Sequence, residues 1–462
     1  MKRGVLQMLE YIPIIMFASV CVILMAGYSV AFSLAGTALL FALYGNVANI
    51  FDMDFLHALP NRLYGIIDNT TLIAVPLFIF MGVMLEKSSL AENLLNSMSQ
   101  LLKSFKGGLG ISVVVVGMLL AASTGIVGAT VVTMGLISLP TMLKEGYSPS
   151  LASGTICATG TLGQIIPPSI ALVLLGDIIA NSYQQAQLAQ GIFAPKAISV
   201  GDLFLGAIVP GMLLVCMYIT YLLVVAHFEP RSTPNITEHK IKSSFFQLLK
   251  PLMPPVILIF SVLGSILFGI ATPTEAAGIG AIGAIMLTYN ANMLSRDLLK
   301  KVAEKTTEIT SMIFLILIGA SIFSLVFRGF GGDELVESLL KNIPGGLFGA
   351  TFLVMLLIFL LGFILDFIEI TYVVVPIVAP ALLSLGLDPI WLGIMIAINL
   401  QTSFLTPPFG FALFYLKGVA PNSVHTQDIY RGVMPFIAIQ IILMAQLAIW
   451  PSIATWLPSL SN

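Results

Sequence analysis

The chain has 462 residues, of which 58% are hydrophobic and only 9% are charged, and its formal net charge at pH 7 is −2. Its mean hydropathy of +1.02 lies far outside the range of soluble globular domains, so the composition indicates a polytopic membrane protein. Because the net charge is close to zero, the chain offers no basic surface, which argues against nucleic acid as a partner.

Apolar runs long enough to cross a membrane recur along the whole chain. Each has roughly 17–25 residues or is a longer piece with a break, and none alternates like a barrel strand, so the sequence predicts an all-α membrane protein. The first run continues past its basic start without a small-residue cleavage site, which predicts a retained helix and not a signal peptide. The runs begin near residues 12, 62, 109, 151, 203, 251, 274, 308, 346, 390 and 432.

Residues 108–143 contain no charged residue but have a small polar centre. Lys103 and Lys106 precede this stretch and Lys144 follows it, so both of its ends are expected on the cytoplasmic side. The interpretation is a re-entrant helical hairpin with the polar centre at its tip. Two short conventional helices joined by a turn among the lipid headgroups are the alternative. The tip would contain Ser123, Thr124, Gly125, Gly128, Ala129 and Thr130.

Two adjacent prolines interrupt the next apolar run, in GTLGQIIPPSIALVLLG at 160–176. Proline has no backbone N–H and its ring clashes with the preceding turn, so Pro167 and Pro168 leave nearby carbonyl groups without helical partners. In hydrocarbon each unsatisfied group costs several kcal/mol, so such a break is tolerated only where it is buried in protein or lines a polar cavity. The break therefore marks a candidate binding site, with Thr159, Gly160, Thr161, Gly163 and Gln164 beside the prolines.

A polar segment, HFEPRSTPNITEHKIKSS at 227–244, divides the chain near its midpoint. We interpret 227–250 as a linker between a first repeat, 1–226, and a second repeat, 251–462. A shift of 240 residues places Pro140, Pro149, Pro167 and Pro168 on Pro380, Pro389, Pro407 and Pro408. Helices broken at corresponding places in two halves mark the binding site of a secondary transporter.

Each repeat is expected to contain scaffold helices, one hairpin and one broken helix. The first repeat would contain hairpin 108–143 and broken helix 151–180, and the second would contain hairpin 346–387 and broken helix 390–419. The base of the second hairpin has no lysine, so it is expected to enter from the opposite side, which makes the repeats inverted.

Asp366 and Glu369 are the only charged residues between Ala350 and Leu387. A carboxylate at membrane depth is costly unless it has a partner, so both are functional candidates by default, together with Thr371 nearby. The alternatives are an interfacial loop, or an acid that is hydrogen-bonded for structural reasons only.

Hydroxyl, amide and free carbonyl oxygens at the breaks suit a dehydrated Na⁺, and half-helix N-termini offer N–H groups to an anion. A single Thr or Ser commonly bonds its own helix backbone instead, so the clustering at matched breaks carries the inference. Na⁺ is expected at the hairpin tips as the coupling ion, without assigned ligands, and no cofactor is expected. The second break contains Asn399, Gln401, Thr402, Ser403 and Thr406.

The remaining chemistry-bearing residues give weaker indications. Cys21, Cys157 and Cys216 lie in apolar runs and suggest neither a disulfide framework nor a metal site. The four histidines show no metal-ligand spacing. Residues 296–305 predict an amphipathic helix on the cytoplasmic face.

Four segments have a recognisable pattern: GTLGQIIPPSIALVLLG (160–176), GDLFLGAIVPG (201–211), GIATPTEAAGIGA (269–281) and NLQTSFLTPPFGFALF (399–414). They closely resemble the large membrane subunit of tripartite ATP-independent periplasmic (TRAP) transporters, the DctM type, and the resemblance covers essentially the whole chain. The resemblance implies an elevator-type, Na⁺-coupled importer of organic acids in the bacterial inner membrane. It also implies two partners, a small four-helix membrane subunit of the DctQ type and a periplasmic solute-binding protein of the DctP type.

Two features depart from the family pattern. The second tip has LDFIEIT where the family usually has a sequence like LDPTA, and residues 178–197 look like an insertion. Because of the first departure, a monocarboxylate or 2-oxoacid is at least as suitable a substrate as a four-carbon dicarboxylate or sialic acid. The rival interpretations are a stand-alone Na⁺–dicarboxylate symporter, a channel, and a membrane-embedded enzyme with Asp366 and Glu369 as an acid pair. No His or Ser–Lys motif accompanies those acids, so we do not expect an enzyme.

Overall fold

The structure is a computed structural model and describes residues 11–88, 90–102, 105–233 and 252–460. All regular elements in these ranges are helices, which confirms the all-α prediction. Six described helices are long and apolar enough to cross a membrane, or seven if the bent pair Ala74–Lys87 and Glu92–Leu101 forms one span. Lys103 and residues 234–250 of the predicted linker lie outside the described residues.

The helices gather into two compact units, each assembled from three separate stretches of the chain. Unit 1 consists of Met1–Leu72, Leu174–Ser199 and Glu308–Leu392, and unit 2 of Ile73–Val173, Val200–Thr307 and Gly393–Asn462. These units interleave along the sequence, whereas the predicted repeats are contiguous halves. Packing and internal similarity are different properties, so the repeat boundaries stay a prediction.

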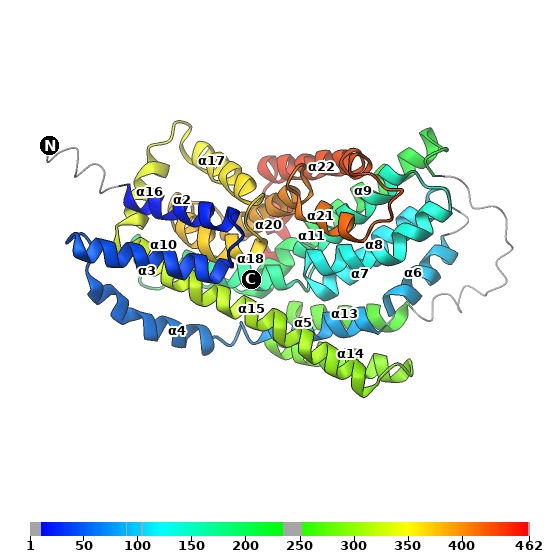
Figure 1. Ribbon diagram of the computed structural model, residues 1–462, viewed down its shortest axis with the longest axis horizontal. Coiled ribbons are helices and arrows are strands. Elements are labelled where there is room, and N and C mark those ends of the chain that lie inside the picture. The colour runs from blue at the N-terminus through cyan, green and yellow to red at the C-terminus, as the bar shows by residue number, and fades with distance from the viewer. Residues whose placement is uncertain (1–10, 89, 103–104, 234–251, 461–462) are drawn as a thin grey trace. The chain divides into compact units, whose positions relative to one another are not determined.

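Unit 1 contains the second predicted hairpin. Its helices α2 and α3 pack against each other (Figure 1), and α19 packs on α16 and on α17. The elements of this unit are α2 (Ile12–Met25), α3 (Val30–Val47), η1 (Met53–Ala58), α4 (Leu59–Ile67), α16 (Gly332–Lys341), α17 (Gly346–Leu361), α18 (Phe367–Glu369), the π-helical turn η3 (Ile370–Val374) and α19 (Val375–Ser384).

Unit 2 contains the first predicted hairpin and both proline breaks. In Figure 1, α5 lies along α14, and α7 lies beside α8. The elements are α5 (Ala74–Lys87), α6 (Leu90–Leu101), α7 (Gly108–Thr124), α8 (Val127–Lys144), α9 (Pro149–Gly160), η2 (Thr161–Gln164), α11 (Val200–Phe228), α13 (Met253–Leu267), α14 (Pro273–Asn290), α21 (Phe411–Val419), α22 (Thr426–Ile449) and α23 (Ser452–Ser459).

Three further helices contain a boundary between the units: α10 (Ile170–Ala189), α15 (Arg296–Gly329) and α20 (Pro389–Leu405). Helix α15 has 34 residues, which corresponds to a length of about 51 Å. The sequence predicted a separate amphipathic helix at residues 296–305. In the structure these residues are instead the first turns of the long helix α15.

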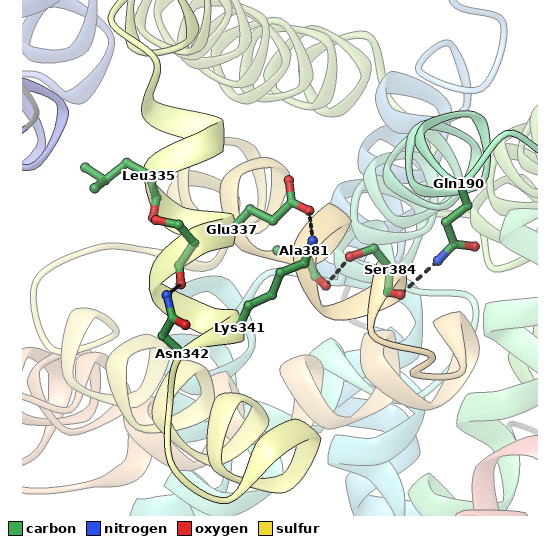
Figure 2. Close-up of polar contacts among 8 residues, drawn as sticks. Gln190, Leu335, Glu337, Lys341, Asn342, Ala381 and Ser384 are labelled. Carbon is green, nitrogen blue, oxygen red and sulfur yellow. Dashed lines mark hydrogen bonds and ion pairs between the residues drawn. The ribbon is translucent and has the colours of Figure 1, made fainter.

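The predicted insertion 178–197 forms the second half of α10 and the start of the loop after it. Gln190, which follows α10, donates from Nε2 to the carbonyl oxygen of Ser384 at 2.8 Å, and the Ser384 hydroxyl donates to the Ala381 carbonyl (Figure 2). The last carbonyl groups of a helix lack intrahelical partners. Gln190 thus satisfies one such group at the end of α19.

The TPTE segment at residues 272–275 caps the start of helix α14. The Thr272 hydroxyl accepts from the Glu275 N–H, and Glu275 Oε2 accepts from the Thr272 N–H at 2.8 Å, which forms a capping box at the start of α14. Pro273 occupies the first helical position, where its missing N–H costs nothing. The motif thus fixes where α14 begins.

Helices α9 and α22 of unit 2 touch through backbone atoms. A Cβ added at Gly154 would lie 2.1 Å from the Gly432 carbonyl oxygen, and one added at Gly432 would lie 1.9 Å from the Ser150 carbonyl oxygen. Only glycine leaves room for such an approach. Because α9 is the helix that leads into the first proline break, this contact fixes the position of the break against α22.

We predict that Gly154→Ala and Gly432→Ala each lower the stability by about 1–3 kcal/mol or more, because the extra methyl group must displace backbone. Gly278→Ala in α14 is the matched control, since its Cβ would meet only Leu77, at 4.0 Å; this change should be neutral or stabilising by up to about 1 kcal/mol. Melting curves of the purified variants measure the difference. Equal melting temperatures for Gly154→Ala and Gly278→Ala would contradict the backbone contact.

Candidate functional site

The first break has the interruption that the two prolines predict. Helix α9 ends at Gly160, the short 3₁₀ turn η2 follows, and α10 begins at Ile170. The Pro167–Pro168 peptide bond is cis. Ser169 Oγ donates to the Gly163 carbonyl at 2.6 Å, and the N–H groups of Ile165 and Ile166 donate to the Leu162 carbonyl. The backbone at the break is thus partly bonded within itself, in a stretch that is buried throughout.

The hydroxyl groups at this break bond their own helix. Thr159 Oγ1 donates to the Thr155 carbonyl at 2.6 Å, and Thr161 Oγ1 donates to the Ala158 carbonyl at 2.8 Å. A hydroxyl that donates its hydrogen keeps oxygen lone pairs that can face a cation. These bonds are therefore compatible both with simple packing and with cation binding.

Gln164 is the polar side chain at this break without a protein partner. It is 1% exposed, and neither its amide nitrogen nor its amide oxygen has a hydrogen-bond partner among the described residues. Leaving a buried donor or acceptor unsatisfied costs about 1–3 kcal/mol. Gln164 is thus a group whose hydrogen bonds a ligand could complete.

The first hairpin lies against this break. Its turn is Gly125, in the left-handed conformation with φ +61°, and a Cβ there would lie 2.8 Å from the backbone nitrogen of Ile170. A Cβ at Gly160 would lie 2.2 Å from Val131 of α8, and one at Gly163 would lie 3.0 Å from the Ala121 carbonyl of α7. Glycines at the break therefore let both arms of the hairpin approach it.

Other residues of the predicted tip are less informative. The Thr130 hydroxyl bonds the Ile126 carbonyl at 3.1 Å. The side chains of Ser123 and Thr124 lie outside the part of the chain whose side chains are described. Gly128 faces Tyr415 of α21, because a Cβ there would lie 2.8 Å from the tyrosine ring. Helix α8 thus contacts α21, the helix that follows the second break, as well as α9 and η2.

The second break repeats the pattern of the first. Helix α20 ends at Leu405, the Pro407–Pro408 bond is cis, and α21 starts at Phe411. Thr402 and Thr406 donate to the carbonyl groups of Ile398 and Thr402, at 2.8 and 2.7 Å. Four of the predicted polar residues here are at most 3% exposed: Asn399, Gln401, Thr402 and Ser403. Unit 2 thus contains the first hairpin and both breaks, and within it α21 contacts α8 and α9.

Asp366 and Glu369 form a capping box in unit 1. Asp366 Oδ1 accepts from the Phe367 N–H at 2.7 Å, and Glu369 Oε2 accepts from the Asp366 N–H at 2.9 Å. The two carboxylates therefore bond the N–H groups that begin α18, where the helix dipole also favours negative charge. The spacing of the two residues is itself a sequence signal for this cap, because an Asp followed three residues later by Glu before an apolar run is typical of a helix start. The capping box gives both acids a structural role, which was the alternative to a functional one.

Thr371, the remaining candidate, lies on the π-helical turn η3 directly after the capping box. Its side chain is fully buried, and its hydroxyl has no hydrogen-bond partner among the described residues. Single π-helical turns are frequent at functional sites. A direct role of Asp366, Glu369 or Thr371 in binding stays a prediction.

The described residues contain no group of three or more His, Cys, Asp and Glu side chains that could hold a metal ion. The polar groups gathered at the breaks are hydroxyl, amide and backbone groups. Oxygen ligands without a cluster of carboxylates or imidazoles suit a weakly held alkali cation better than a transition metal.

A membrane protein with two matched helix breaks and a hairpin packed on one of them has the architecture of a secondary transporter. The model of one protein family matches residues 17–453, and that family is the DctM component of the tripartite ATP-independent periplasmic transporters. The chain therefore belongs to the DctM family, as its motifs had indicated.

Curated relatives cover nearly the full length of the chain. It is 30% identical to the C4-dicarboxylate TRAP transporter large permease protein DctM of Vibrio cholerae, over 96% of this chain and 97% of that protein. It is 27% identical to the sialic acid TRAP transporter large permease protein SiaM of the same organism, over 95% and 96%. It is 28% identical to the ectoine TRAP transporter large permease protein TeaC of Halomonas elongata, over 97% and 99%.

A solved structure also has a similar fold. The crystal structure of the Alcanivorax borkumensis YdaH transporter matches with a TM-score of 0.61 at 14% identity, and the match covers 87% of this chain and 90% of that one. At this identity the likeness concerns the fold alone. It agrees with the predicted helical membrane fold.

The capping box yields a stability prediction. Asp366→Ala should lower the stability by about 1 kcal/mol, because the side-chain acceptor at the N-cap is lost, whereas Asp366→Asn should stay near the wild type, because Asn is an equally good N-cap. Melting curves of the two variants measure the contrast. If Asn destabilised as much as Ala, the negative charge and not the cap would be what Asp366 contributes to folding.

Proposed function

We propose that this protein is the large permease subunit of a TRAP system that imports an organic acid together with Na⁺ across the bacterial inner membrane. It would work with a small four-helix membrane subunit and a periplasmic solute-binding protein. The observation that carries the proposal is the pair of proline breaks in unit 2, lined by buried oxygen-bearing side chains, in a member of the DctM family. An elevator movement of the site, implied by the family resemblance, is part of the proposal.

The breaks support a carboxylate as the substrate. Residues 149–176 and 393–416 contain no charged residue, so an anion held there would have no Lys or Arg partner in these segments. The half-helices α10 and α21 both begin just after a break, and each helix N-terminus carries roughly half a positive charge. Two N-termini therefore balance about one negative charge. This favours a monocarboxylate or 2-oxoacid over a dicarboxylate.

The relatives support the same chemical class at a coarser level. Their names specify C4-dicarboxylate, sialic acid and ectoine, three different molecules that each carry a carboxyl group. We propose that the substrate of this chain shares the common feature, a carboxyl group. The particular acid would be selected by this chain's own residues, and the LDFIEIT tip, which departs from the usual family sequence, is our candidate segment for that selection.

Na⁺ as the coupling ion is supported by the chemistry of the side chains. Thr159, Thr161 and Thr402 donate their hydroxyl hydrogens to backbone carbonyl groups, which leaves their oxygen lone pairs available to a cation. A stand-alone symporter would use the same oxygens but no binding protein. An enzyme is not favoured, because hydrolysis gives no reason for two matched breaks, and Asp366 and Glu369 already bond helix N–H groups.

The proposal predicts that uptake by the reconstituted permease and its small subunit requires both an inward Na⁺ gradient and the cognate binding protein. The physical reason is that the cation supplies the driving force while the binding protein delivers the acid. Uptake of labelled acid into proteoliposomes measures this, with K⁺ in place of Na⁺ and with the binding protein omitted as controls. Comparable uptake of free substrate without the binding protein would favour the stand-alone symporter.

A second prediction concerns the topology of the first hairpin. Lys106 and Lys144 are both exposed at the ends of 108–143, and Asp388 is exposed beyond the end of α19. Single cysteines at Lys106 and Lys144 should react with an impermeant thiol reagent from the cytoplasmic face, and one at Asp388 from the opposite face. The background would lack Cys21, Cys157 and Cys216. Reaction of the first two from opposite faces would make the segment an ordinary span.

A further inference from the structure

The segment 178–197 of unit 1 is a sequence feature that the proposed function leaves without a role. It consists of the second half of α10 and the start of the following loop, and it is rich in side-chain amides. An amide group both donates and accepts hydrogen bonds, so it can join backbone or charged groups without adding a charge. The contacts of its glutamines therefore indicate what the segment does. These amides belong to Asn181, Gln184, Gln185, Gln187 and Gln190.

Gln187 folds the loop after α10 back onto the helix. Its Oε1 accepts from the Lys196 N–H at 2.9 Å, and its Nε2 donates to the Lys196 carbonyl oxygen at 3.0 Å. The Gln187 side chain is 6% exposed, and hydrogen bonds shielded from water are stronger than exposed ones. The end of α10 and the loop after it are thus one ordered unit.

Gln185 connects this unit to two helices that lead to the second hairpin. Arg328 Nη2, in the last turn of α15, donates to Gln185 Oε1 at 3.1 Å. Arg328 Nε also lies 3.0 Å from Oδ2 of Asp333, in the first turn of α16. One guanidinium group therefore joins α10 to the end of α15 and to the start of α16.

Gln190 holds the last arm of the second hairpin at its base. Its bond of 2.8 Å is made to the carbonyl oxygen of Ser384, the final residue of α19 (Figure 2). Helix α19 continues from α18 and η3, so Phe367–Ser384 is one helical stretch of 18 residues, with a length of about 27 Å. The capping box of the LDFIEIT tip, at 365–371, begins the same stretch. Gln190 and the tip are therefore at opposite ends of one helix.

We propose that the segment 178–197 is a brace that fixes the base of the second hairpin and thereby positions the LDFIEIT tip. Gln185 restrains the chain that leads into the hairpin, through Arg328 at the start of α16, and Gln190 restrains the chain that leaves it, at Ser384. Helix α16 also packs on α19, so both attachments act on the same arm.

The physical basis of this positioning is the stiffness of a helix. A rigid element transmits a tilt of one end to the other, so a looser base would displace the tip. The inference rests on the proposed function, in which the tip selects the acid. It makes Gln185 and Gln190 positioning residues for transport.

Hydrogen exchange of the purified permease tests the brace without requiring a known substrate. Gln190→Met keeps the size of the side chain and removes its donor. We expect the backbone amides in the last turn of α19 and in the tip, 365–374, to exchange roughly threefold faster or more, because local opening becomes easier. Gln190→Lys keeps a donor for the carbonyl groups at the end of the helix, so it should exchange like the wild type.

Gln184→Met is the matched control. Gln184 lies on the same helix, is exposed, and forms no hydrogen bond among the described residues. This change should leave the exchange at the tip unchanged. Gln185→Met removes the acceptor of Arg328 and should again speed the exchange at the tip, so it tests the brace even if Gln190→Met folds poorly. Exchange at the tip that is the same in all three Met variants, or faster exchange confined to the end of α19, would overturn the positioning role.

Uptake of labelled pyruvate, a 2-oxoacid, separates this inference from the proposed function. Na⁺-dependent uptake by the wild type, with no faster exchange at the tip in Gln190→Met and Gln185→Met, would retain Na⁺-coupled transport and remove only the brace. Faster exchange at the tip in both variants, with wild-type uptake that does not depend on Na⁺, would retain the brace and remove the Na⁺ coupling.

Discussion

The backbone groups freed by the two Pro-Pro pairs must find partners inside the protein, because lipid offers none, and the arrangement of unit 2 follows from this requirement. At the first break Ser169 and Leu162 supply bonds within the chain, and both arms of the first hairpin pack against it. Glycines at 160 and 163 leave room for those arms, most clearly at Gly160, where a Cβ would lie 2.2 Å from Val131. The same packing that makes the breaks tolerable also gathers their oxygen atoms in one unit.

Carboxylates in this protein are satisfied mainly by neutral donors. Asp366 and Glu369 accept backbone N–H groups at the start of α18, and Asp177 accepts side-chain amides. Both kinds of donor are neutral N–H groups, but the backbone N–H groups belong to a helix start, so Asp366 and Glu369 contribute to local structure. The position of a carboxylate at membrane depth is therefore a weaker guide to function than the identity of its partners.

Much of the fold could be predicted from the sequence, because its main determinants are local. Composition predicts helices, and adjacent prolines predict where two of them break. The capping box at Asp366 is also local and could have been predicted from its spacing. The packing of Gly125 on Ile170 and the environment of Asp177 could not, because both depend on residues that are distant in the sequence, as does the interleaving of the two units.

The contact between α9 and α22 differs in kind from an ordinary helix interface. Side chains adapt to a shift of a few tenths of an ångström by changing rotamer, but at Gly154 and Gly432 the backbones themselves touch. A contact between backbones has no side-chain rotamers that could absorb a shift, so the two helices either keep the contact or separate. Any rearrangement of unit 2 that keeps this contact intact must move α9 and α22 together as one rigid body. The first break, which follows α9, would move with them.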